Sequence, residues 1–172
     1  MKRVEESKEI LEIIKDLPAD SYEEGQEVCE KLLAGGPATI ELLVAMVGQE
    51  FGDPDGVQPK YALHGMVHHA SRPGADEQRK MLAKTLAGQL DADHSDELKA
   101  FVVRQLQLCG SADEVPALAK LLSSDRLCDP AAQALSAIGG SQVEKALNSA
   151  LSGATGSRKV TIEQAIAFVS AK

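Results

Sequence analysis

Apolar residues recur at three- and four-residue spacing along most of the chain, in short runs separated by Gly, Pro and Asp. This spacing puts the apolar side chains on one face of an α-helix, and no stretch shows the Val, Ile and Thr alternation of a strand. The pattern therefore predicts about ten short helices and no sheet. Their expected ranges are 4–17, 21–34, 37–51, 59–71, 76–91, 96–109, 114–124, 130–138, 143–152 and 158–171.

Residues that favour helix ends mark the boundaries between these runs. Short polar side chains cap helix N-termini, and Gly pairs end helices. We expect N-caps at Asp20 or Ser21, at Ser95 or Asp96, and at Asp113, and helix ends at the Gly pairs 35–36 and 139–140. The first helix should end before Pro18. Its expected buried face consists of Val4, Leu11, Ile14 and Leu17.

The later helices share a register. The apolar positions of the second helix in each predicted pair are 63, 66, 67 and 70, then 102, 105, 106 and 109, then 131, 134, 135 and 138, then 162, 165, 166 and 169. All are apolar except Gln105. Any amphipathic bundle yields such stripes, but short helices, short turns and recurrent Ala favour helix pairs stacked side by side. Leu106, Leu135 and Ile166 should therefore lie in one continuous apolar seam.

Three segments carry a family resemblance, namely VPALAKLL at 115–122, CDPAAQALSAIGG at 128–140 and VEKAL at 143–147. Together they resemble HEAT-type repeats, in particular the short bacterial repeats grouped with phycobilisome lyases. The resemblance implies a right-handed α–α superhelix, a HEAT/armadillo-like solenoid of four to five helix pairs. Residues 1–172 would form one domain, with acidic cap helices over 1–36 and four helix pairs over 37–172. One departure is the missing Val-Arg start of the inner helix at 130–131.

The resemblance also implies a function. HEAT-like repeats form curved, non-catalytic scaffolds that bind other macromolecules on a concave side. A protein or peptide partner is therefore expected. The alternative implied by the same resemblance is a lyase-type module that acts on, or chaperones, a tetrapyrrole or a modified protein.

The composition of the chain limits which partners it is expected to bind and in which compartment it is expected to lie. The formal charge is -8, which disfavours binding to a nucleic-acid backbone. No run approaches a membrane span or a secretory signal, so we predict a cytoplasmic protein. The three cysteines form no CxxC pair and are expected to be buried thiols on helices. Aromatic residues are only 3% of the chain, which suits closely spaced aliphatic helices.

Candidate chemistry is sparse. His64 and His68 lie one helical turn apart and could share a metal, but Gly65 stands where a zinc protease carries Glu. The segment 53–56 resembles the start of a calcium-binding loop, but Val57 and His64 occupy positions where such a loop needs oxygen ligands. We therefore predict a turn there. We therefore predict no cofactor and no catalytic residue. A metal-dependent hydrolase built on the histidines stays as a minor alternative.

Polar residues on the second helices, pointing away from the seam, are the expected partner-binding surface. Tyr61, His64 and Arg104 should be its anchors, because aromatic and Arg side chains contribute most at interfaces. An ordinary solvated face is the competing interpretation. The predicted surface consists of Tyr61, His64, His68, Arg104, Gln107, Gln133 and Ser136.

The two ends of the chain differ. The first two helices are acidic, as a terminal cap requires. The last helix carries Ile162, Ile166, Phe168 and Val169, which make it apolar on more than one side. We expect that side to be covered, either by a second copy in a homodimer or by further repeats.

Overall fold

The computed structural model describes residues 2–50 and 57–171, and these ranges form ten α-helices, two short 3-10 helices and no strand. The predicted all-helical class is therefore confirmed for the described residues. The α-helices are α1 (Lys2–Ile14), α2 (Tyr22–Ala34), α3 (Gly36–Glu50), α4 (Gln58–Ala70), α5 (Asp76–Gln89), α6 (Asp96–Cys109), α7 (Val115–Lys120), α8 (Cys128–Ile138), α9 (Ser141–Leu151) and α10 (Gly156–Ser170).

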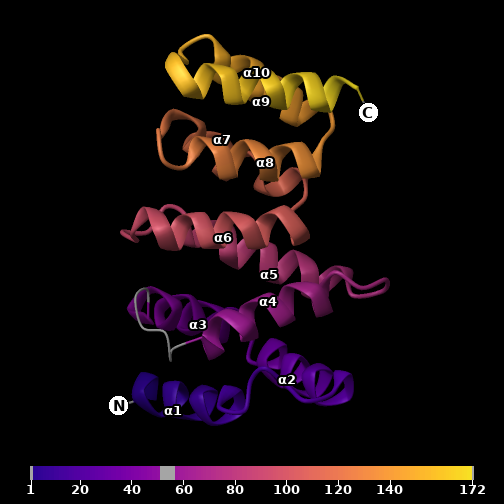
Figure 1. The fold of residues 1–172 in the computed structure, drawn as a ribbon. Coiled ribbons are helices and arrows are strands. Elements are labelled where there is room, and N and C mark those ends of the chain that lie inside the picture. Colours follow the sequence, from indigo (N-terminus) through magenta and orange to yellow (C-terminus); the bar gives the residue numbers. More distant parts are fainter. Residues whose placement is uncertain (1, 51–56, 172) are drawn as a thin grey trace.

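The helices form two layers. In one layer α2, α4, α6, α8 and α10 pack in succession, each against the next, and in the other α1, α3, α5, α7 and α9 do the same. Consecutive helices pack across the layers, so α3 lies on α4, α5 on α6 and α9 on α10. Figure 1 shows the resulting stack, with α1 and α2 at one end and α9 and α10 at the other.

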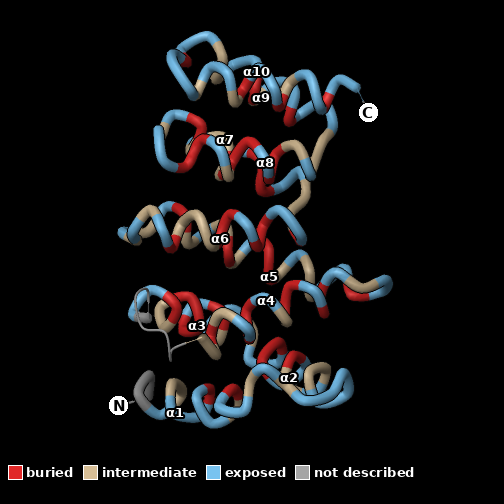
Figure 2. The backbone as a smooth tube through the Cα atoms, in the orientation of Figure 1, coloured by how far each residue is buried: buried red, intermediate tan, exposed pale blue. Residues whose placement is uncertain are grey.

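One apolar core runs through the whole stack. It is a single connected cluster from Ile10 in α1 to Val169 in α10, and Figure 2 shows buried positions in successive helices from end to end. Leu106 and Leu135 are fully buried, and Ile166 is partly buried against the same cluster. The predicted continuous seam is therefore confirmed. It includes Gln105, whose side chain is buried despite its amide.

The helix starts follow local chemistry, with one correction. Ser21 and Ser95 cap α2 and α6, and each side chain accepts a hydrogen bond from a backbone N–H three residues later. The predicted cap at Asp113 is wrong, because Ser111 caps a short 3-10 turn and forms a reciprocal capping box with Glu114. The expected single helix over 114–124 is divided into a 3-10 turn, α7 and a second 3-10 turn over 121–123.

Two terminal expectations also need correction. Helix α1 ends at Ile14 and buries Ile10 and Ile14, which leaves Leu11 47% exposed. At 100° per residue Ile10 and Ile14 share one face and Leu11 lies beside it. Val4 lies outside the residues whose side chains the structure describes. Helix α10 begins at Gly156, two residues before the predicted start.

Other boundaries agree with the sequence. Gly35 ends α2, and the chain turns by 111° into α3, which packs against five neighbouring helices. The predicted turn at 53–56 lies outside the described residues. Among the described helices, none by itself is both long enough and apolar enough to cross a membrane; α2 and α3 reach that length and composition only as a sharply bent pair.

Candidate functional site

The outward side of the layer formed by α2, α4, α6, α8 and α10 carries three hollows, and we call it the hollowed face. Hollow 1 lies between α2 and α4 and has a volume of about 420 Å³. Hollow 2 lies among α6, α8 and α10 and has a volume of about 680 Å³. Hollow 3, of about 300 Å³, lies between α4 and α6. These volumes fall at or within the ~300–1,000 Å³ that is typical of ligand sites.

Most of the predicted surface residues line these hollows. Tyr61, His64 and His68 line hollow 1, while Gln107, Gln133 and Ser136 line hollow 2. The structure thus divides the predicted surface into two groups rather than one pocket. Arg104 is exposed but lines none of the three hollows. Whether these residues bind a partner stays a prediction.

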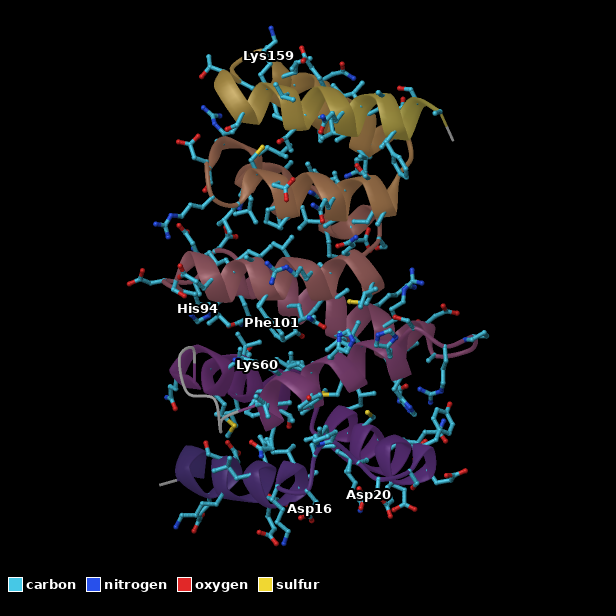
Figure 3. All side chains as sticks on the ribbon, in the orientation of Figure 1. Asp16, Asp20, Lys60, His94, Phe101 and Lys159 are labelled. Atoms are coloured by element: carbon cyan, nitrogen blue, oxygen red, sulfur yellow. The ribbon has the colours of Figure 1, made fainter. Side chains whose placement is uncertain are left out.

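The aromatic residues gather on this face. Tyr22 and Tyr61 line hollow 1, Tyr61 and Phe101 line hollow 3, and Phe168 lines hollow 2. The remaining aromatic residue, Phe51, lies outside the described residues. Tyr22, Tyr61 and Phe168 are 75%, 48% and 55% exposed, whereas Phe101 is partly buried and packs against the core. Figure 3 shows Phe101 and Lys60 on the neighbouring helices α6 and α4, where both line hollow 3.

Formal charge is scarce in the three hollows. Among the described residues that line them, only Lys60, Arg72 and Asp129 are charged at neutral pH, whereas 26% of the chain is charged. Asp129 accepts a hydrogen bond from Gln133 Nε2 at 2.9 Å. Depletion of charge together with enrichment of aromatic residues is the composition found at the centre of protein interfaces.

A hydrogen-bonded chain holds the two predicted histidines. His64 Nδ1 lies 3.2 Å from Gln105 Oε1, and His64 Nε2 lies 3.1 Å from His68 Nε2. Because an amide oxygen only accepts, His64 donates from Nδ1 and its Nε2 then accepts from His68 Nε2–H. The buried Gln105, the polar exception in the seam, therefore orients the exposed His64 ring.

His69 was not singled out for this face, yet it lines hollow 1 beside His64 and His68. Its side chain is only 5% exposed, and its Nε2 has no hydrogen-bond partner among the described residues. Glu30 Oε1 lies 3.8 Å away, beyond hydrogen-bonding distance. The pKa of His69 is lowered, mainly by burial and further by the positive charge of Arg72, while the negative charge of Glu30 acts to raise the pKa. His69 lies seven residues, or two helical turns, after Ala62, which is buried. This spacing is the sequence signal that could have predicted that His69 faces inward.

The cysteines offer no reactive thiol. All three are free and buried, as predicted. Burial raises the pKa of Cys109 to about 12 and raises the pKa values of Cys29 and Cys128 as well. Because the thiolate is the nucleophile and the metal ligand, these thiols are held in their unreactive form. Within the described ranges, no group of three or more His, Cys, Asp or Glu side chains is arranged to hold a metal ion.

The structure therefore defines a class of site rather than a reaction: a neutral, aromatic-lined face on one layer of a two-layered helical stack. Comparison of the sequence with protein-family models and with curated proteins finds no match to either.

Proposed function

We propose that this chain is a non-catalytic HEAT-like α-solenoid that binds a protein partner through the hollowed face. The stacking of consecutive helix pairs in two layers supports the solenoid, since each pair buries its apolar side against the next. The face would be the concave side of the superhelix.

The placement of the aromatic residues is the observation that carries this proposal. The core is aliphatic, and every aromatic residue in the described part of the chain lines a hollow on one face. Exposing an aromatic ring to water forgoes the burial that would stabilise the fold. Tyr and Phe instead supply large contact areas with few rotatable bonds, which suits them to interfaces. Selection for binding explains this placement better than selection for stability.

The chemistry of the face also indicates the kind of partner. Besides the aromatic rings it presents uncharged donors and acceptors, such as Gln107, Gln133 and Gln164, around shallow apolar floors. A polypeptide segment with apolar side chains and free backbone amides matches both features. A nucleic acid would need clustered cations, and Lys60 and Arg72 are the only ones among the described residues lining the hollows.

The test is capture of a partner from the source organism, followed by affinity measurements with three variants. Tyr61→Ala and Phe168→Ala should each weaken binding by about tenfold or more, as interface anchors do. Leu11→Ala is the matched control, because Leu11 is an exposed apolar residue outside the three hollows. Equal losses in all three variants, or a partner indifferent to Tyr61 and Phe168, would refute the proposal.

A further inference from the structure

We propose that hollow 1 binds an apolar carboxylate, with its hydrocarbon part between α2 and α4 and its carboxylate at Arg72 and His69. This inference does not rest on the proposed protein partner. It concerns a single hollow of about 420 Å³ and two of the polar side chains that line it, His69 and Arg72.

The walls of hollow 1 suit a hydrocarbon body. Leu17 and Pro18, which precede α2, form one side, and Val28 and Cys29 of α2 form another with Ala62 of α4. Tyr22 and Tyr61 add two exposed aromatic rings to the lining. An apolar cavity with a few convergent polar groups is the usual form of a small-molecule site.

The unpaired nitrogen of His69 points to a ligand. A buried polar atom without a partner costs free energy, and native structures rarely leave one. His69 Nε2 is such an atom in the described part of the chain, and His69 lines hollow 1. In the Nε2–H tautomer the neutral ring donates one hydrogen bond, and a ligand oxygen that enters between the side chains around this buried nitrogen would receive it.

Arg72 supplies the charge that selects an anion. Its Nη1 donates to the His69 backbone oxygen at 2.5 Å and to Gln78 Oε1 at 3.3 Å, which holds the guanidinium at the C-terminal end of α4. Arg72 forms no ion pair with any described residue, and no Asp or Glu lines hollow 1. The carboxylate of Glu30, 3.8 Å from His69 Nε2, is 62% exposed and does not line the hollow. The single positive charge of Arg72 matches a singly charged carboxylate.

Two sources share this chemistry: a free small acid, and the C-terminal carboxylate of a partner that ends in an apolar residue. Both would place hydrocarbon against Val28 and Ala62 and oxygen atoms at Arg72. The experiment separates them with different probes.

Calorimetric titration should compare octanoate with 1-octanol, which differ in the carboxylate, and a short peptide ending in Ala-Leu with its C-terminally amidated form. We expect one of the two acids to bind about tenfold or more tightly than its uncharged counterpart. Tighter binding of octanoate identifies a small acid, and tighter binding of the free peptide identifies a C-terminus. Arg72→Gln should reduce the ratio to near one, and Arg72→Lys should restore part of it.

A filled-hollow variant tests the location. Gly25 lines hollow 1, and a Cβ built there meets only Ala19 Cβ at 3.8 Å, so Gly25→Leu has room to fold while occupying the hollow. Gly88→Leu is the matched control, since Gly88 is exposed on α5 with nothing within 4 Å of its added Cβ. With both variants folded by circular dichroism, Gly25→Leu should abolish binding and Gly88→Leu should not. The inference is overturned if neither acid binds, if the uncharged probes bind equally well, or if Gly25→Leu binds like the wild type.

Discussion

Four polar residues on α4 and α6 show which features of the hollowed face could be predicted from the sequence. His64 and His68 were predictable as outward-facing from their register, because one helical turn separates them and neither falls on the apolar stripe. Gln105 was predictable only as an exception to that stripe. The Gln105 side chain contacts His64 and so joins α6 to α4. The two residues are 41 positions apart in the sequence, so no pattern within one helix could have predicted this contact. His69, one residue beyond His68, is buried on the same helix.

The buried His69 makes stability depend on pH. Burial and Arg72 hold the pKa of His69 below its usual 6.5 in the folded state, while the unfolded chain titrates normally. Well above pH 6.5 both states are neutral at this site, so His69 adds no pH dependence there. As the pH falls below 6.5 the unfolded state binds the proton first, so the free energy of unfolding decreases.

Urea unfolding of the wild type and of His69→Gln, at about pH 7.5 and about pH 5.5, checks this expectation. The wild type should lose more stability between the two pH values than the variant, since His64, His68 and His94 are common to both. An equal loss in both proteins would show that His69 titrates normally in the fold.

Among the secondary-structure elements, the periodicity of apolar residues predicted which segments are helices. It did not fix where each helix begins and ends, because the ends depend on capping contacts. The stripes over α4, α6 and α8 predicted those helices because each pattern is long and regular. The start of α7 was misplaced because Asp113 and Ser111 both suit an N-cap, and only the returning Glu114 side chain selects Ser111. Leu11 was misplaced because the phase of α1 is set by the contacts of Ile10 and Ile14 with the core.

The capping box before α7 yields a test of this selection. Ser111→Ala removes the hydroxyl that accepts from the Asp113 N–H, and should lower the free energy of unfolding by about 1 kcal/mol. Asp113→Ala removes only an exposed carboxylate from the first turn and should cost about half as much or less. Thermal melts of the two variants measure the difference, and a larger loss for Asp113→Ala would restore the original assignment.

In the molecule as a whole, successive helix pairs are also linked by ion pairs. Lys120 Nζ lies 2.9 Å from Asp91 Oδ1, Arg126 Nη1 lies 3.3 Å from Glu97 Oε1, and Arg158 Nε lies 2.8 Å from Asp125 Oδ1. Each pair joins residues 29 or 33 positions apart, close to the offset between the last three second helices, whose first apolar positions are 102, 131 and 162. Most of these groups are exposed, so each pair contributes at most ~1 kcal/mol, and the apolar core holds the stack.

The layered core could be predicted from the sequence, because burial of Leu106 and Leu135 is encoded in each helix separately. The hollows could not. Hollow 1 needs the segment at 17–19 to lie against α4, about forty residues further along the chain, and hollow 2 needs side chains from three helices. Such arrangements depend on how one helix pair packs against the next, and the spacing of apolar residues within a helix does not determine that packing.

We expect the hollowed face to contact another protein and the opposite layer not to do so. Photo-cross-linking measures this directly, with a benzophenone side chain placed either at Gln133, exposed in hollow 2, or at Asn148, exposed on α9 of the other layer. Position 133 should give a discrete higher-mass adduct in cells of the source organism, and position 148 should give none. Adducts of equal yield from both positions, or from position 148 alone, would contradict this expectation.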